Sequence, residues 1–270
     1  MNKKTEITRK PLYIAQITDT HLYADPRGQL LGLNTRDCLT RIIDLAISTQ
    51  APDLVVASGD LAHDGSPQAY QHLHTCFSRL GVPIYCLPGN HDEAVALRAN
   101  SECGHLYSSR SVCIGGWLLL FLDSTVTGSD GGHLAETELD ELDTALASHP
   151  GLPALVCLHH QPVNIGSRWL DTMAVDNPKA FFNIIDRHPQ VRAVIWGHVH
   201  QTFEQERNGV RLLSTPSTCI QFLPDSEKFA VDMIPPGYRW LELYPDGTFK
   251  TGVTRLQMIP GEIDLGARGY

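Results

Sequence analysis

Short runs of apolar, strand-forming residues recur along the chain, and most of them end at polar residues. Runs of this length that are apolar throughout are typical of strands buried on both faces of a sheet. The predicted buried strands span residues 12–18, 54–58, 82–87, 118–122, 154–158 and 192–196.

Between these runs, apolar residues recur at the three- and four-residue spacing of an amphipathic helix. Leu39, Ile42 and Ala46 fall on one helical face, and we predict Thr35 as the N-cap of this helix. Pro67 suits the first turn of a second helix. The predicted helices span residues 35–49, 66–80, a segment that begins after residue 92, 136–147 and 178–187.

The alternation of strands and helices predicts an α/β fold in which helices cover the sheets. Beyond residue 200 the pattern changes to short strands and turns, with strands predicted over 210–214, 238–244 and 248–254. This part, about 210–256, is therefore expected to be rich in β-structure. No repeat or linker interrupts the chain, so we predict a flexible segment over 1–11 and a single domain over 12–270.

Composition narrows the possible partners. The formal net charge of -9 argues against a surface that attracts nucleic acid, because phosphate binding depends on clustered Lys and Arg. No apolar segment is long enough to cross a membrane, and the polar N-terminus lacks the features of a secretion signal, so we expect a cytoplasmic protein. The seven cysteines form no C-x-x-C pair, which argues against a disulfide framework or a zinc ribbon.

Five of the predicted strands end in residues that commonly bind metals. The five groups are Asp19-x-His21, Gly59-Asp60, Gly89-Asn90-His91-Asp92, His159-His160 and Gly197-His198-x-His200. Because ligand sites form where the carboxyl ends of strands meet in α/β sheets, these groups can converge although they lie far apart in the sequence. The glycine in front of Asp60, Asn90 and His198 suits turns in which the backbone passes close to a bound ion.

Each group taken alone has an ordinary structural explanation. A strand-end aspartate commonly caps a helix or forms a turn, and adjacent histidines are often a core residue beside a surface residue. Five such groups together favour a shared metal site. Carboxylate, imidazole and amide ligands without thiolate suit Mn²⁺, Fe²⁺ or Zn²⁺. Two such ions about 3.5–4 Å apart can activate a hydroxide and stabilise phosphoryl oxygens.

In this order, the groups D-x-H, G-D, G-N-H-D, H and G-H-x-H resemble the calcineurin-like metallophosphoesterase family. The resemblance implies a four-layer αββα sandwich with two mixed sheets flanked by helices and a dinuclear metal site at the carboxyl ends of the strands. It implies the following ligands: Asp19, His21 and His200 for one ion, Asn90, His159 and His198 for the other, and Asp60 as the bridge. It also implies that His91 donates a proton to the leaving oxygen.

Two residues beside the predicted ligands, His160 and Asp92, are not assigned as ligands. The family's ligand aligns with the first histidine after the strand, which assigns metal binding to His159 rather than His160. Asp92 either orients His91 or caps the chain while facing solvent, and both alternatives stay open at this point.

The chain is also similar over nearly its whole length to the bacterial class III cyclic AMP phosphodiesterases. The similarity rests on residues 17–22, 31–35, 166–171 and 215–222, and it continues to the C-terminal Gly-Tyr. It implies hydrolysis of 3′,5′-cyclic AMP to 5′-AMP by in-line attack of a metal-bridging hydroxide on phosphorus. The implied cofactors are two divalent ions, Fe²⁺ and/or Mn²⁺, with Zn²⁺ as an alternative.

The same resemblance implies which residues lie near the substrate. The implied substrate-binding residues are His21, Asp60, Asn90, His91 and His200. The loop over 216–222 is expected beside the metals, where it either shapes a pocket for the base or packs on the C-terminal sheet. Gln161 stands where the commoner family form has proline or histidine, and no consequence for the substrate is predicted.

Other functions compatible with the motifs are less favoured. Phosphoprotein phosphatases are expected to carry an arginine soon after the second motif to clamp a phosphate dianion, and none follows Asp60 closely. A nuclease would need a basic face. The remaining alternatives are a broader phosphodiesterase or phosphoesterase for other small esters, and a metal-stabilised binding scaffold without catalysis. Retention of every ligand type and of His91 disfavours the scaffold.

Overall fold

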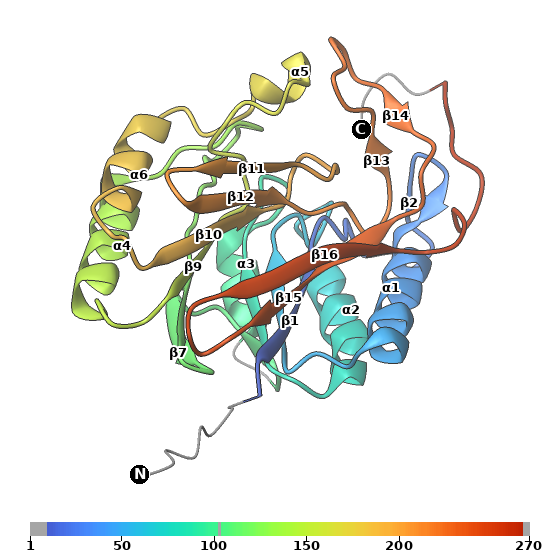
Figure 1. The fold of residues 1–270 in the computed structure, drawn as a ribbon. Helices are drawn as coiled ribbons and strands as arrows, with labels where there is room; N and C mark the ends of the chain where they lie inside the picture. Colours follow the sequence, from blue (N-terminus) through green and yellow to red (C-terminus); the bar gives the residue numbers. More distant parts are fainter. Residues whose placement is uncertain (1–9, 102–103, 267–270) are drawn as a thin grey trace.

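The computed structural model describes residues 10–101 and 104–266, and its strands form two large mixed sheets (Figure 1). The first sheet contains, in spatial order, β16 (Phe249–Arg255), β15 (Gly237–Leu243), β1 (Leu12–Ile17), β4 (Leu54–Ser58), β5 (Ile84–Leu87) and β6 (Leu106–Tyr107). The second contains β11 (Glu204–Arg207), β12 (Val210–Ser214), β10 (Val191–Trp196), β9 (Ala154–Cys157), β8 (Trp117–Phe121) and β7 (Ser111–Ile114). Two small hairpins are β2 (Gln29–Leu30) with β3 (Leu33–Asn34) and β13 (Gln221–Phe222) with β14 (Val231–Asp232).

The central strands of both sheets are parallel, and antiparallel strands complete the sheets. Strands β1, β4, β5 and β6 run parallel in the first sheet, and β8, β9, β10 and β12 run parallel in the second. The antiparallel additions are β15 and β16 in the first sheet and β7 and β11 in the second. Parallel strands bring their carboxyl ends to one edge, which is the arrangement that the sequence motifs require.

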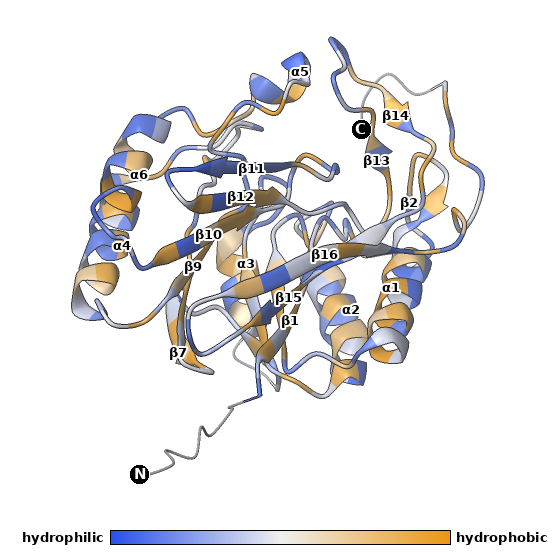
Figure 2. Ribbon diagram, in the orientation of Figure 1, coloured by the Kyte–Doolittle hydropathy of each residue, from blue (hydrophilic) through white to orange (hydrophobic). Residues whose placement is uncertain are grey.

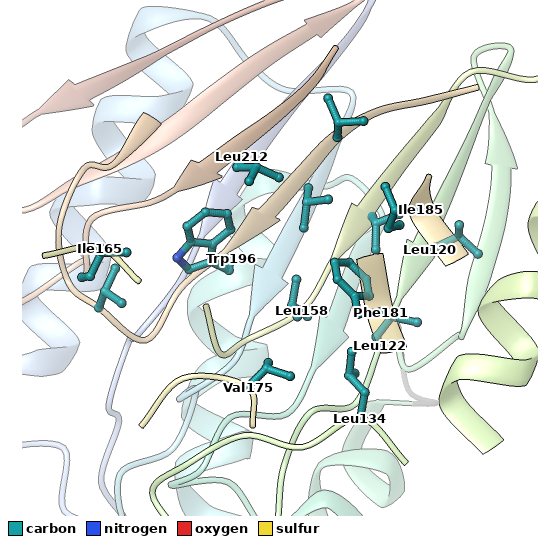
Figure 3. Packing of buried hydrophobic residues seen from close by; sticks show 14 of the residues in the cluster. Leu120, Leu122, Leu134, Leu158, Ile165, Val175, Phe181, Ile185, Trp196 and Leu212 are labelled. Atoms are coloured by element: carbon teal, nitrogen blue, oxygen red, sulfur yellow. The ribbon is translucent and has the colours of Figure 1, made fainter. Parts of the chain in front are cut away.

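Helices cover the outer faces of both sheets. The helices are α1 (Thr35–Thr49), α2 (Pro67–Phe77), α3 (Ala94–Ser101), α4 (Glu136–Ser148), α5 (Arg168–Asp171) and α6 (Pro178–Ile185), and a 3₁₀ turn, η1 (Ser78–Leu80), follows α2. Apolar residues of α1 and α2 pack on the first sheet, and those of α4 and α6 pack on the second. Figure 3 shows Phe181 and Ile185 of α6 beside strand residues of the second sheet. No helix in the described part of the chain is both long and apolar enough to cross a membrane.

Successive side chains of a central strand pack on opposite faces of its sheet, one toward the helices and one toward the other sheet, as the predicted four layers require. Val55 belongs to the cluster beneath α1 and α2, whereas its neighbour Val56 belongs to the cluster between the two sheets. Because side chains alternate along a strand, a strand buried on both faces must be apolar at successive positions. Figure 2 shows this pattern as orange central strands, whereas the edge strand β11 is blue. The predicted αββα sandwich is confirmed.

A small polar network joins the two sheets next to the predicted metal-binding residues. The buried Gln16 side chain donates to Ser58 Oγ at 2.9 Å and to the Trp196 carbonyl at 3.1 Å. These three residues come from β1, β4 and β10, so the network spans both sheets. Buried polar groups need such partners, and fully paired ones fix how the two sheets are aligned.

The predicted elements differ from the structure mainly at their ends. Asn34, and not Thr35, is the N-cap of α1, because its side chain accepts from the backbone N–H of Asp37 at 2.7 Å. The predicted helix over 66–80 is an α-helix only to Phe77. Several short or exposed elements were not predicted, among them β6, β7, β11, α5 and the two small hairpins. The single-domain assignment stays a prediction, and residues 1–9 of the predicted flexible segment lie outside the described residues.

Candidate metal centre

The five strand-end groups converge at the junction of the two sheets. Asp19 and His21 follow β1, Asp60 follows β4, and Asn90 and His91 follow β5 in the first sheet. The second sheet contributes the histidines that follow β9 and β10, namely His159, His160, His198 and His200. Nitrogen and oxygen atoms of Asp19, His21 and His200 lie within 4.8 Å of one another, as do those of Asp19, Asp60 and His159.

Asp60 lies between two sets of possible ligands. Its Oδ2 atom is 3.3 Å from His159 Nε2 and 3.8 Å from His21 Nε2. His159 Nε2 is also 3.2 Å from Asn90 Oδ1, while its Nδ1 contacts the Ser58 carbonyl at 2.9 Å. One ring nitrogen of His159 is therefore anchored to the backbone, and the other faces Asp60 and Asn90.

The second set gathers around Asp19. Its carboxylate accepts from the backbone N–H of His198 and lies 3.4 Å from His200 Nε2. His200 Nε2 is 3.2 Å from His21 Nε2, and His200 Nδ1 is anchored to the Ile220 carbonyl. As with His159, a backbone carbonyl fixes the outer ring nitrogen, which is how proteins orient metal-binding histidines.

The buried polar atoms of this cluster suit a divalent cation. Both ring nitrogens of His198 are buried without a hydrogen-bond partner among the described residues. An unpaired buried polar group costs free energy, and a cation between these residues would remove that cost. Imidazole nitrogens combined with carboxylate and amide oxygens are the ligands that borderline divalent ions prefer.

Burial and neighbouring charges set the protonation of these histidines. Burial lowers the pKa of His21 and of His198 well below the ordinary value, which keeps both rings neutral as metal ligands must be. Burial acts in the same direction on His159, but the adjacent Asp60 carboxylate outweighs it and raises the pKa to about 9. Burial alone would raise the pKa of Asp60, and the neighbouring His159 holds it well below the ordinary value.

The backbone is strained where it presents these side chains. Asp19, His21, Asp60, His198 and His200 all have positive φ angles, between 44° and 64°, a region that non-glycine residues rarely adopt. Such strain collects at functional sites, where the surrounding structure enforces it.

Glycines allow the close approach that the sequence predicted. A Cβ atom on Gly59 would lie 2.3 Å from His159 Nδ1, and one on Gly89 would lie 2.2 Å from Asp60 Oδ1. Side chains at these two positions would occupy the space that the predicted ligands need.

His91 lies at the accessible side of this cluster. Its backbone N–H donates to Asp60 Oδ1 at 2.9 Å, and its ring centroid lies 5.0 Å from that of His21. The ring is partly exposed, whereas His21 and Asp60 are fully buried. A side chain in this position can reach a substrate while its backbone stays fixed to the cluster.

The structure decides only in part between the two roles that the sequence analysis left open for Asp92. It is half-buried, and its carboxylate accepts from the backbone N–H groups of Leu61, Ala62 and Gly89 and from the Tyr70 hydroxyl. Asp92 therefore caps backbone N–H groups, as the second alternative proposed, and its side chain is only partly exposed. Asp92 joins the loops after β4 and β5, and burial raises its pKa to about 6.

The positions of uncertain role lie around the cluster. One ring nitrogen of His160 lies within 4.8 Å of ring nitrogens of His159 and His198, and its Nε2 is buried without a hydrogen-bond partner among the described residues. His160 Nδ1 contacts Ser124 Oγ at 2.8 Å, and Gln161 donates to the Leu170 carbonyl at 2.7 Å. In the 216–222 loop, Ser217 donates to the Asp19 carbonyl, and the Phe222 ring stacks on His200 with centroids 4.3 Å apart. All seven loop residues are buried, which favours the packing role over a base pocket.

The sequence analysis did not identify His63. Its ring lies in the same cluster, with Nδ1 3.1 Å from His21 Nδ1, and burial lowers its pKa to about 4. The available signal was a histidine three residues after Asp60, within the same loop.

Comparison with known proteins agrees with this geometry. Residues 12–202 match the family model described as calcineurin-like phosphoesterase, which spans all five groups. The chain belongs to the calcineurin-like phosphoesterase family. Solved structures share its fold, including a dimetal phosphatase from Danio rerio with a TM-score of 0.65 at 16% identity, covering 91% of this chain and 99% of that one.

Relatives of known name match over almost the full length of this family member. The chain is 37% identical to the 3′,5′-cyclic adenosine monophosphate phosphodiesterase CpdA of Pseudomonas aeruginosa, covering 100% of this chain and 99% of the relative. It is 40% identical to the protein of that name from Escherichia coli K12, covering 95% and 94%. A 3′,5′-cyclic-nucleotide phosphodiesterase of a Nostoc species is 39% identical, covering 91% and 93%.

Proposed function

We propose that this protein hydrolyses 3′,5′-cyclic AMP to 5′-AMP with the help of two divalent metal ions. The observation that carries the proposal is the position of Asp60, whose Oδ2 atom lies 3.3 Å from His159 Nε2 and 3.8 Å from His21 Nε2. A carboxylate between two sets of ligands is the arrangement of a bridging ligand. Similarity to cyclic AMP phosphodiesterases over the whole chain supports the choice of substrate.

The proposed ligands divide into two sets around that bridge. Asp19, His21 and His200 form the first, and His159, His198 and the partly exposed Asn90 form the second. When bound there, two cations supply a water-derived nucleophile at neutral pH and neutralise charge on the phosphoryl oxygens. We propose Fe²⁺ or Mn²⁺ as these cations, with Zn²⁺ as the alternative, because the set combines imidazole and oxygen ligands without thiolate.

We propose that His91 donates a proton to the leaving oxygen. Hydrolysis breaks the bond between phosphorus and the ribose 3′ oxygen, and the departing alkoxide needs a proton. The His91 ring is partly exposed beside the buried His21, and its backbone is tied to Asp60. It can therefore donate this proton from the substrate side without leaving the cluster.

A substrate panel tests the proposal. Chelator-stripped protein is reloaded with Mn²⁺ or Fe²⁺ and assayed on 3′,5′-cyclic AMP and GMP, 2′,3′-cyclic AMP, a linear phosphodiester and 5′-AMP, with products separated by chromatography. We expect 5′-AMP from 3′,5′-cyclic AMP and little release of inorganic phosphate. Efficient hydrolysis of 5′-AMP, or no turnover of any diester by metal-loaded protein, would overturn the proposal.

A further inference from the structure

His63 lies in the loop after β4 and contacts two residues of the proposed site. Its Nδ1 atom is 3.1 Å from His21 Nδ1, and its ring stacks on that of His91, with centroids 4.7 Å apart and planes 20° apart. Tyr23 contacts the same ring, with centroids 4.7 Å apart. His63 is partly exposed, so it lies at the boundary between the buried ligands and the accessible side.

The first contact determines which nitrogen of His21 carries a proton. A hydrogen bond between two neutral imidazole nitrogens needs one donor and one acceptor. His21 Nε2 faces Asp60 and His200, so this atom must keep its lone pair if it is to bind a cation. The proton of His21 then sits on Nδ1 and is donated to His63 Nδ1. In this arrangement His63 holds the His21 ring in the tautomer and orientation that metal binding requires.

The second contact restricts the His91 ring. A partly exposed histidine can rotate about its side-chain bonds, and each rotation moves the nitrogen that would donate the proton. The His63 ring covers one face of His91 in a nearly parallel stack, and Tyr23 supports His63 in turn. Aromatic stacking of this kind favours a single orientation of the two rings.

We propose that His63 is a positioning residue with two separable effects: it orients His21 for metal binding and holds His91 for proton donation. The inference rests on the proposed function, because it assumes the roles given there to His21 and His91. The two effects use different properties of one side chain, a nitrogen acceptor and a flat ring, so different substitutions separate them.

Two variants test the effects separately. His63→Phe keeps a ring that can stack but removes the acceptor for His21 Nδ1. We expect its affinity for one of the two Mn²⁺ ions to fall about 10–100-fold in equilibrium dialysis against a competing chelator, the usual effect of losing such a partner. His63→Asn keeps a polar atom near the position of Nδ1 but removes the ring. We expect Mn²⁺ affinity within about 3-fold of wild type and a kcat for cyclic AMP lower by about 10-fold or more, as a displaced acid would cause.

The activity loss of His63→Asn should depend on the leaving group. A nitrophenyl phosphodiester expels a stable anion that needs no proton, so its turnover should stay near the wild-type rate. His72, a partly exposed histidine of α2 that contacts the Ala24 carbonyl, gives matched controls. His72→Phe and His72→Asn should leave both Mn²⁺ affinity and the ratio of the two rates unchanged. Melting temperatures of chelator-treated proteins check that each variant is folded.

The possible results separate this inference from the proposed function. Unchanged Mn²⁺ affinity in His63→Phe would overturn the role toward His21, and this measurement needs no activity at all. Equal losses on both substrates in His63→Asn would overturn the role toward His91. Failure of the wild-type protein to hydrolyse any diester would instead overturn the proposed function, while the affinity measurement would still decide the contact with His21.

Discussion

His159 Nε2 and Asp60 Oδ2 lie 3.3 Å apart, and both side chains are fully buried. Asp60 follows a strand of the first sheet and His159 follows a strand of the second, so this contact exists only when the two sheets are packed together. The candidate metal centre is therefore a product of the whole sandwich. Each of its halves alone would present only part of the ligand set.

The same pair predicts that metal binding releases protons. Asp60 raises the pKa of His159 to about 9, so at neutral pH a metal ion must displace a proton from this ring. Binding should release about one proton from His159, and affinity should rise with pH until about pH 9, because the proton competes less above that value. Calorimetric titration with Mn²⁺ in two buffers of different ionisation enthalpy measures the release. Binding heats that are independent of the buffer would contradict this prediction.

Asp60 and Asn90 should differ in how much metal they hold. Asp60 lies near both His21 and His159. The Asn90 Oδ1 atom lies 3.2 Å from His159 Nε2, so Asn90 belongs to only one of the two proposed ligand sets. Asp60→Ala should therefore weaken the binding of both metal ions, and Asn90→Ala should mainly weaken the binding of one. Metal analysis after dialysis gives the stoichiometry, with the exposed Asp140→Ala as a control expected to match wild type. One ion per chain in fully active wild-type protein would refute a two-metal site.

Gly59 and Gly116 have similar φ angles, so alanine variants of the two can distinguish the effect of backbone strain from that of steric crowding. Gly59 and Gly116 have φ angles of +95° and +86°, but only a Cβ on Gly59 would meet other atoms, at 2.3 Å from His159 Nδ1. Gly116→Ala should lose about 1–3 kcal/mol of unfolding free energy through strain alone. Gly59→Ala should lose more and should also displace His159 and weaken metal binding. Denaturant unfolding and metal analysis of both variants test this, and equal behaviour would show that crowding is unimportant.

Asp92 should matter mainly for stability. Its carboxylate accepts from three backbone N–H groups and the Tyr70 hydroxyl, all in or near the loops that carry Asp60 and Asn90. Asp92→Ala should cost about 2–4 kcal/mol in unfolding free energy, because buried donors lose their acceptor. Asp64, an exposed residue that accepts from two backbone N–H groups, provides the comparison. Asp64→Ala should cost less than about 1 kcal/mol, and a larger loss there than at Asp92 would contradict the argument.

The strand ends and the motifs that follow them could be predicted because each is encoded by a local pattern of apolar and polar residues. A buried parallel strand must be apolar at successive positions, so the ends of β1, β4, β9 and β10 were visible as transitions from apolar to polar residues. The motifs at those ends followed directly. The four-layer arrangement came from the family resemblance, and the separate clusters that contain Val55 and Val56 then confirmed it.

The elements that were not predicted depend on partners elsewhere in the chain. Glu204–Arg207 is hydrophilic, and it is a strand because it pairs with Val210–Ser214 at the sheet edge. Asn34 and Thr35 are both suitable caps, and only the hairpin that ends at Asn34 decides between them. The contact of His63 with His21 likewise arises from two loops folded against each other, so a local sequence pattern cannot predict it.

His91 offers the sharpest test of the chemistry, because its proposed role predicts a dependence on the leaving group. Its backbone N–H still contacts Asp60 in His91→Ala, so this variant should keep its metal ions. On cyclic AMP the variant should lose about 10²–10⁴-fold in rate, the usual effect of removing a general acid, since the 3′ oxygen leaves poorly without a proton. On a nitrophenyl phosphodiester, whose leaving group is stable as an anion, the loss should be much smaller. Equal losses on both substrates at unchanged metal content would mean that His91 stabilises charge on the phosphoryl oxygens, and another residue would then have to supply the proton.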